Sequence, residues 1–456
     1  MKILWFGDIG RPTSFSRISE SVIPHLSVES GGAVSCYVLA PPRSLIKSVD
    51  ALRHATKVYH VGDPIPSIGM TWELFSALDT ASPYPSTPNA VRAQTSFASV
   101  DAVRSTVLSL KMKYALLQAI QYSKDENIDY IIFVIGIYEA DWFMNLYNNA
   151  RLTQVLPKVI VWTPLDYKPS HKVVENICKA DMLFTMTNSG MQSIQAATTE
   201  RPNIYVVPHA VSKCFYKIPR RKAYKYLKPI IKTLNKDDLV ILNANNYVDR
   251  KQIHLTIEAF AAVKDATFGR RDGSQTKPTG TKLWLHTNTK NPEFIRMLEY
   301  YRKKFNFSED EIILTMNDAS EEMLNNIYNF CQIGLQTSWG EGWSLTNCEH
   351  AITGAIQVVP DFLATGEHFR RTGYAYQVGE KEYINEAGHT VTIADIKLEN
   401  VVQSLIDAVQ NANSASKVPS AALPYRREAS KDTAEPYLRG FTWEAIANQI
   451  KDLIVM

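Results

Sequence analysis

Residues 338–354 read SWGEGWSLTNCEHAITG, and the expected fold follows from this stretch. It starts as a loop with two glycines, continues as a run typical of a helix at residues 345–353, and stops at a further glycine. Apolar runs at 332–337 and 355–361 flank it, and each is typical of a buried strand. The order strand, loop, helix, strand predicts a βαβ unit, whose ligands bind at the carboxyl ends of the strands. The free N–H groups of the first helical turn add a site for an anion.

Two carboxylates accompany this anion site. Glu341 lies in the loop, and Glu349 follows eight positions later in the helix. Glutamates at this spacing also occur by chance, so the prediction depends on their place between two strands. With Glu341 in the loop, both carboxylates can point into one cleft, where they suit a ligand with phosphate and hydroxyl groups, such as a nucleotide sugar. The alternative is a pair of solvated glutamates at the start of a helix.

The composition narrows the class of protein. A length of 456 residues is too great for one core and favours two α/β domains. The net charge of +3 is too small to indicate nucleic acid or an anionic membrane as the main partner, whereas a peripheral contact with a membrane stays open. Five scattered cysteines without a C-x-x-C pair are typical of a reducing compartment and offer no zinc or disulfide framework. No run reaches the roughly 18–20 apolar residues that cross a bilayer, and the start lacks a signal peptide's apolar region. We therefore expect a cytoplasmic protein.

Strand and helix patterns alternate along the chain. In a first domain, 1–211, strands are expected at 2–6, 34–41, 130–136, 158–163, 181–188 and 204–211. A segment dense in Lys and Arg, 212–238, opens a second domain, 212–440, as a solvated linker or surface helix. Strands at 239–246, 282–288, 311–316, 332–337 and 355–360 follow. An amphipathic helix, 441–456, closes the chain, and we expect it to pack back on the first domain.

Several residues at strand ends are further candidates. Lys251 stands in the turn after the strand at 239–246, where a fixed cation can pair with a diphosphate; the alternative is a solvated lysine at a helix start. Arg250 beside it is expected to lie at the surface or to support the site without contacting the ligand. Asp166 follows a strand of the first domain and can face the cleft, so with Glu341 and Lys251 it is a candidate catalytic residue; the alternative is an aspartate without a direct chemical role. His209, at another strand end, is expected to be a structural histidine with satisfied hydrogen bonds. The sequence contains no D-x-D, no H-E-x-x-H and no clustered His and Cys, so no metal is expected.

These motifs resemble, in order, those of the GT-B glycosyltransferases, specifically the large retaining group called family four. The similarity covers most of the second domain and reaches into the first. The family's E-G-[FW]-x-L loop and E-x(7)-E spacing match Glu341, Gly342, Trp343, Ser344, Leu345 and Glu349, followed by Gly354, Val358, Val359 and Asp361. Three other motifs match Asn245, Asn246 and Lys251; Pro208, His209, Ala210, Val211, Ser212 and Phe215; and Phe441, Thr442, Trp443 and Glu444.

The resemblance implies a fold and a donor site. It implies two Rossmann-like, doubly wound parallel-sheet domains that face each other across a cleft. Glu341 would contact hydroxyls of the donor hexose, and Glu349 those of the ribose. Lys251 would hold the diphosphate together with the backbone N–H groups of residues 343–345 in the glycine loop. The segment that contains Met316 and Asn317 would border the base.

The chain also departs from the family pattern. The usual partner of the lysine is an arginine, which is Asn246 here, and Arg250 is a candidate replacement. Asp166 stands where the family often has a histidine beside the donor sugar. The first loop, on the acceptor side, lacks the usual glycine pair and offers Gly10, Ser16 and Arg17 instead.

The resemblance implies transfer of a hexose from a nucleotide diphosphate sugar to a glycan or another hydroxyl acceptor. Retention at the anomeric carbon and independence from a metal are expected with it. Two alternatives stay open. One is a nucleotide-sugar epimerase on the same fold, which needs no acceptor. The other is a catalytically silent subunit that binds a nucleotide sugar or a partner protein.

Overall fold

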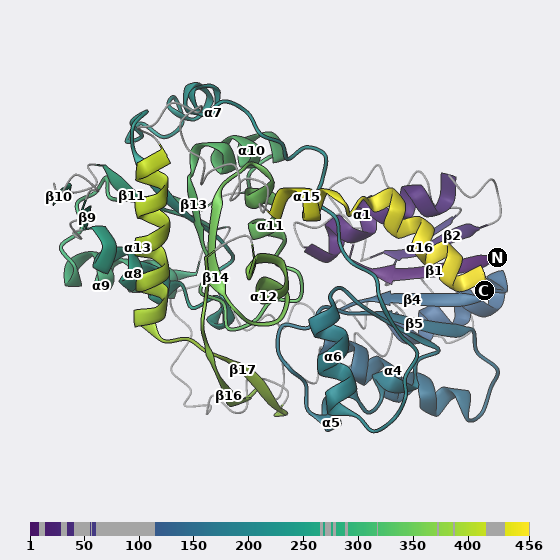
Figure 1. Ribbon diagram of the computed structural model, residues 1–456. Coiled ribbons are helices and arrows are strands. Elements are labelled where there is room, and N and C mark those ends of the chain that lie inside the picture. The colour runs from purple at the N-terminus through teal and green to yellow at the C-terminus, as the bar shows by residue number, and fades with distance from the viewer. Residues whose placement is uncertain are drawn as a thin grey trace, which may run out of the picture.

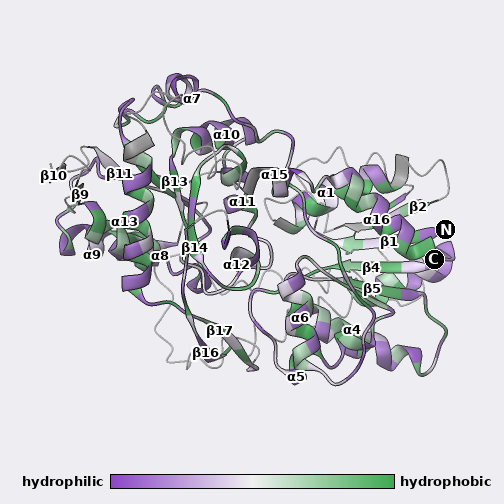
Figure 2. Ribbon diagram, in the orientation of Figure 1, coloured by the Kyte–Doolittle hydropathy of each residue, from purple (hydrophilic) through white to green (hydrophobic). Residues whose placement is uncertain are grey.

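The computed structural model describes residues 1–8, 14–28, 34–40, 55, 57–60, 115–264, 268–269, 275–276, 280–287, 291–316, 318–371, 374–385, 388–415 and 434–455. Within these residues the chain forms two parallel sheets, each flanked by helices (Figure 1). Figure 2 shows hydrophobic residues along strands of both sheets, which is the pattern of strands buried on two faces. The predicted fold class, two doubly wound α/β sheets, is confirmed.

The first sheet has the strand order β3-β2-β1-β4-β5-β6-β7, with all pairs parallel among the described residues. Its strands are β1 (Lys2–Gly7), β2 (Ser35–Ala40), β3 (Lys57–His60), β4 (Tyr130–Val134), β5 (Lys158–Trp162), β6 (Met182–Thr185) and β7 (Ile204–Val206). Its helices include α1 (Ser14–Val28), α4 (Ile137–Arg151), α5 (His171–Val174) and α6 (Asn188–Ala197). The order reverses between β1 and β4, and the carboxyl ends at this reversal are where open sheets bind ligands.

The second sheet has the order β12-β11-β8-β13-β14-β15 and is also parallel in the part that the structure describes. Its strands are β8 (Leu239–Ala244), β11 (Thr281–His286), β12 (Ile312–Thr315), β13 (Ile333–Leu335), β14 (Ile356–Pro360) and β15 (Tyr374–Tyr376). Its helices are α8 (Ile253–Lys264), α9 (Pro292–Lys304), α10 (Glu321–Phe330), α11 (Leu345–Ile352), α12 (Leu363–Phe369) and α13 (Leu398–Ala415). The reversal lies between β8 and β13, so the turns after these strands meet at one edge.

Three further pieces complete the described chain. The basic segment before β8 contains α7 (Arg220–Leu227), which packs on α10. The strands β16 (Gly379–Ile384) and β17 (Thr390–Asp395) form an antiparallel hairpin. A short two-stranded ladder joins β9 (Phe268–Gly269) and β10 (Gln275–Thr276).

The last helix returns to the first sheet. Helix α15 (Ala434–Arg439) packs on α11, and α16 (Trp443–Val455) packs on α1, as Figure 1 shows in yellow and purple. Buried residues of α16, among them Ile446, Ile450 and Ile454, belong to the same core cluster as Trp5 of β1. The exact domain limits, 1–211 and 212–440, stay a prediction. Among the described residues, none of the helices combines the length and apolar character that crossing a membrane requires.

Candidate functional site

The glycine loop between β13 and α11 lies directly against the loop that follows β5. A Cβ at Gly340 would overlap the carbonyl oxygen of Asp166, and one at Gly342 would overlap Pro164. The N–H of Gly342 donates to the Asp166 carboxylate at 2.9 Å. Only residues without a side chain allow this approach, which explains both glycines and joins the two halves of the chain at the site.

The hairpin of β16 and β17 holds the same loop after β5 from another side. Lys168 and Thr392 exchange two backbone hydrogen bonds of 2.9 Å, and the Lys168 ammonium reaches Glu380 at 2.5 Å. Trp339, at the start of the glycine loop, packs on Tyr383 of the hairpin with ring centroids 4.9 Å apart. The position of Asp166 is therefore fixed by contacts from the second half of the chain.

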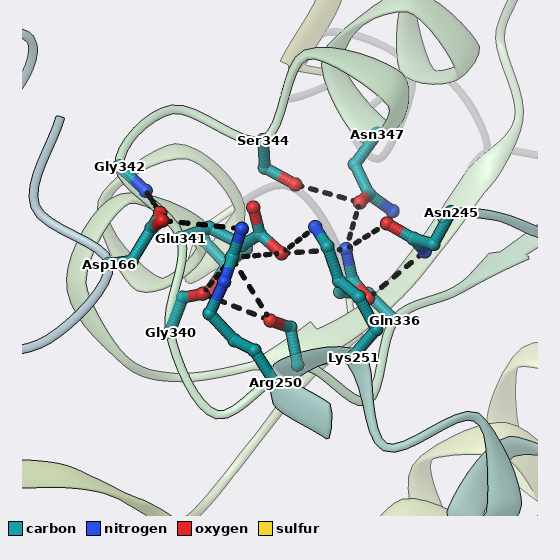
Figure 3. A network of polar contacts seen from close by, with 12 residues as sticks. Asp166, Asn245, Arg250, Lys251, Gln336, Gly340, Glu341, Gly342, Ser344 and Asn347 are labelled. Carbon is teal, nitrogen blue, oxygen red and sulfur yellow. Dashed lines mark hydrogen bonds and ion pairs between the residues drawn. The ribbon is translucent and has the colours of Figure 1, made fainter. Parts of the chain in front are cut away.

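Two cations converge on Glu341 (Figure 3). Its carboxylate pairs with Lys251 and lies 3.0 Å from Arg250. Arg250 also reaches the Asp166 carboxylate at 3.2 Å and donates to the carbonyl of Gly340 at 2.6 Å. Burial by itself raises the pKa of Glu341, but Arg250 and Lys251 outweigh it and lower the pKa to about 2. The cluster of Glu341, Lys251, Arg250 and Asp166 thus carries paired charges at the carboxyl ends of β5, β8 and β13.

A buried amide supports this charge cluster from beneath. Gln336 donates to Glu341 at 3.3 Å and to Asn347 at 3.2 Å, and its oxygen accepts from Asn245 at 3.2 Å (Figure 3). The hydroxyl of Ser344 donates to Asn347 at 2.8 Å, which anchors the start of α11. Sequence reasoning missed Gln336. Its place at the end of the expected strand 332–337 was the available signal.

Helix α11 begins beside this cluster. Ser344 precedes it with a φ of 66°, a left-handed conformation that turns the chain sharply into the helix. The first N–H groups of a helix have no intrahelical acceptor and attract anions. Lys251 and Arg250, although paired with Glu341 and Asp166, place cationic groups at this end, so the site is suited to a phosphate group.

Glu349, one turn further along α11, contacts the first domain. Its Oε1 lies 2.5 Å from Nη1 of Arg17 on α1, and its Oε2 accepts from the Tyr328 hydroxyl at 2.9 Å. The Glu349 side chain is 3% exposed, and burial raises its pKa although Arg17 opposes this. Arg17 was expected to line a loop on the acceptor side; the structure places it on the carboxylate that the resemblance assigns to the ribose.

The expectation for His209 is wrong in one respect. The residue is buried, but neither ring nitrogen has a hydrogen-bond partner among the described residues. Its ring lies 5.6–5.9 Å from the rings of Trp162, Trp343 and Trp443. Because burial disfavours the charged ring, the pKa of His209 falls to about 3. Trp343 packs the glycine loop onto this aromatic cluster rather than facing solvent.

The remaining predicted residues lie in varied settings. Asn246 is exposed, and its neighbour Asn245 makes the buried contact instead. Met316 is 38% exposed at the end of β12, and Leu345 is half-buried. Ser16 donates to Glu20 within α1. Gly10 and Asn317 lie outside the described residues.

The space next to the site is small. A cavity of about 10 Å³ lies behind α11, between residues that include Asn245, Asn347 and His350. Such a volume holds about one water molecule. This cavity is therefore too small for a nucleotide. Within the described residues there is no group of three or more His, Cys, Asp or Glu side chains suited to a metal.

Comparison with solved structures identifies the fold. HepE of Anabaena, solved with UDP and glucose, matches with a TM-score of 0.62 and 11% identity over 100% of this chain and 99% of its own. Sucrose-phosphate synthase of Thermosynechococcus elongatus matches with a TM-score of 0.66 and 12% identity over 100% and 98%. An Escherichia coli protein bound with UDP-2-fluoro glucose matches with a TM-score of 0.60 and 13% identity over 99% of both chains.

The full-length coverage of these matches shows that the chain has the GT-B fold, as the resemblance implied. No protein-family model matches the sequence, and the search of curated proteins found no relative.

Proposed function

We propose that this protein is a glycosyltransferase that moves a hexose from a nucleotide diphosphate sugar, with UDP as the first candidate, to a hydroxyl acceptor. The main support is the cluster of Lys251, Arg250 and Glu341 beside the start of α11, at the carboxyl ends of the strands of the second sheet. HepE was solved with UDP and glucose, and the E. coli neighbour with UDP-2-fluoro glucose. Cations and free N–H groups suit the diphosphate of such a donor, and carboxylates suit the hydroxyls of its sugar and ribose.

Each charged group then has a role. Lys251 and Arg250 would bind the diphosphate and stabilise negative charge on the leaving nucleoside diphosphate. Glu341 would accept hydrogen bonds from hydroxyls of the hexose, and Glu349 from hydroxyls of the ribose. Asp166 would orient Arg250, to which it is paired at 3.2 Å. Reaction with retention is part of this proposal.

The chemistry proposed for the donor site needs no metal ion. Two cations and the start of α11 supply the positive charge that a divalent ion would otherwise bring to a diphosphate. Burial and the adjacent Arg250 lower the pKa of Lys251, and the pairing with Glu341 opposes this shift.

A donor that binds between the glycine loop and the loop after β5 would require the two halves of the chain to separate and close again. The contacts of Gly340 and Gly342 with the loop after β5 leave no room for a sugar between them. Closure over a bound donor would exclude water and limit hydrolysis of the donor.

Thermal unfolding with a panel of UDP, GDP, ADP and their common sugar conjugates tests the donor site, with EDTA and then with magnesium. A ligand that binds only the folded state raises the melting temperature. We expect one nucleotide to stabilise the protein in EDTA. A shift that needs magnesium would refute the metal-independent site, and no shift from any nucleotide would favour a silent subunit.

Two substitutions separate the roles of the carboxylates. Glu341→Gln should lower transfer by about 100-fold or more while nucleotide binding persists, because the hexose contact is lost. Glu349→Gln should weaken nucleotide binding by about tenfold. Variants that bind and turn over donor like the parent would show that the site is wrongly placed. Conversion of the donor sugar without any acceptor would indicate an epimerase instead.

The basic segment before β8 is the proposed point of contact with an anionic membrane surface. Residues 213–236 contain nine Lys and Arg and no Asp or Glu, so the rest of the chain, with 40 basic and 46 acidic residues, has a net charge of −6. Lys222 and Lys225 of α7 are exposed, and so are Tyr216 and Ile230, which are 50% and 52% exposed. Clustered cations with exposed apolar side chains favour anionic lipid.

Sedimentation with lipid vesicles tests this contact. Vesicles that contain phosphatidylserine should bind the protein at low salt, and pure phosphatidylcholine should not. The double substitution Lys222→Glu and Lys225→Glu should abolish binding, whereas Lys303→Glu on α9 should not change it. Vesicle binding that changes neither with the salt concentration nor with the lipid charge would contradict the proposal. None of the five cysteines forms a disulfide among the described residues, which fits the proposed cytoplasmic location facing such a membrane.

A further inference from the structure

Arg17 and Tyr328 together occupy both oxygens of Glu349. Tyr328 is 1% exposed and bonds to Oε2 from within the second domain. Arg17 reaches Oε1 from the first domain, and its side chain is 38% exposed. The buried tyrosine is fixed by its packing, whereas the arginine lies on the open side of the carboxylate. Arg17 is therefore the partner that a ligand can replace.

A ribose that binds Glu349 must compete with Arg17. Hydroxyl groups of the ribose would donate to the carboxylate, and Oε1 already accepts from Arg17 at 2.5 Å. The ion pair is partly shielded from water, so an exchange for neutral hydroxyls is unfavourable unless the displaced guanidinium gains another anion. A nucleoside offers none.

A nucleoside diphosphate offers that anion on the same ribose. Its phosphates begin at the 5′ carbon, within the reach of a side chain that has just left the ribose contact. Guanidinium groups bind phosphate with paired hydrogen bonds.

We propose that Arg17 is a gate to the ribose subsite, which pairs with Glu349 in the free protein and moves to the donor phosphates when a nucleotide binds. The proposal rests on the donor site proposed above. It makes the phosphates necessary for ribose binding, so the site discriminates strongly against nucleosides. It also lets the first domain contact the donor directly, which links donor binding to domain closure.

Calorimetric titration with uridine and with UDP tests the gate. If the thermal panel identifies another base, the nucleoside and the nucleoside diphosphate of that base are used instead. The readout is the ratio of the two dissociation constants in the parent, Arg17→Ala, Arg17→Lys and the control Lys179→Ala. Lys179 is a first-domain cation whose carboxylate partner, Glu175, lies 3.9 Å away on the surface. Each variant is first checked for a cooperative unfolding transition.

In Arg17→Ala, uridine should bind more tightly and UDP more weakly, so the ratio of uridine to UDP dissociation constants should fall about tenfold or more. Arg17→Lys should restore part of the ratio, because a lysine is a charge without the paired donors. Lys179→Ala should match the parent. A ratio within twofold of the parent in Arg17→Ala, or equal weakening of both ligands, would overturn the gate while the donor site stands. If no nucleotide binds the parent, the proposed function fails and the gate with it.

Discussion

Three buried histidines make the stability of the protein depend on pH. His209, His350 and His368 are all fully or nearly buried, and burial lowers their pKa values to about 3, 4 and 4. In the unfolded chain each would titrate near 6.5. The unfolded state therefore binds more protons than the folded state below pH 6.5. The contribution of these residues to stability is complete above pH 6.5 and is lost as the pH falls toward the folded values.

The pH dependence can be measured with a variant of His209. Each buried histidine should lower the free energy of unfolding by about 1.4 kcal/mol per pH unit below 6.5. His209→Phe keeps an aromatic ring among the tryptophans and removes the titrating group, so its stability should fall less between pH 7 and pH 5. Urea denaturation at both values gives the comparison, with the exposed His171→Phe as control. Equal pH slopes for His209→Phe and the parent would contradict the assignment.

Loops rather than regular elements bring the site together. The glycine loop follows β13, Arg250 and Lys251 come from the short 3-10 helix η4 (Asp249–Lys251) in the connection after β8, and Asp166 comes from the loop after β5. Parallel strands end at one edge of a sheet, so the first two turns meet within the second domain. The third joins them because the two glycines permit contact between domains.

Gly340→Ala tests this contact between loops. The added Cβ would overlap the carbonyl oxygen of Asp166, so the loops must move apart, which should lower the free energy of unfolding by about 1–3 kcal/mol. Transfer activity should fall as well, since Asp166 would lose its place beside Arg250. The control is Gly379→Ala in the hairpin, where the nearest atom to the new Cβ is at 3.6 Å. If Gly340→Ala matched this control in stability and in turnover, the contact between the loops would not be needed for either.

The last helix connects the end of the chain to the first domain. Helix α16 follows the second sheet in the chain but packs on α1, which carries Arg17. Its buried residues join the core cluster that also contains Trp343 of the glycine loop. Loss of this packing would therefore disturb both the first domain and the site.

A pair of substitutions within α16 measures that packing. Ile450 is fully buried, so Ile450→Ala should lower the free energy of unfolding by about 2–5 kcal/mol. Val455, 65% exposed in the same helix, should tolerate Val455→Ala with a change within about 0.5 kcal/mol. Similar effects from both substitutions would show that the buried face of α16 does not stabilise the protein. Chemical denaturation distinguishes the cases.

Much of the second domain could be predicted from the sequence. The runs at 332–337 and 355–361 contain β13 and β14, and the helix expected at 345–353 is α11. Each depends on local periodicity and on a glycine that ends a helix, which neighbouring residues specify. The basic segment, expected to be a linker or surface helix, contains α7. The order of the motifs also predicted the GT-B fold.

Partners across the molecule could not be predicted in this way. Arg17 and Glu349 are 332 positions apart, and no local pattern indicates that one neutralises the other. His209 was expected to have hydrogen bonds, but its surroundings are three tryptophans from separate elements. Gln336 gave no signal beyond its place at a strand end.

The sequence by itself determined the elements and the charges available at the carboxyl ends of the strands, because periodicity and turn residues act over a few positions. The tertiary structure alone decided which charges pair. Packing of α1, α16 and the two glycine contacts sets the distances between domains, and ion pairs in a buried site depend on those distances rather than on the spacing of residues along the chain.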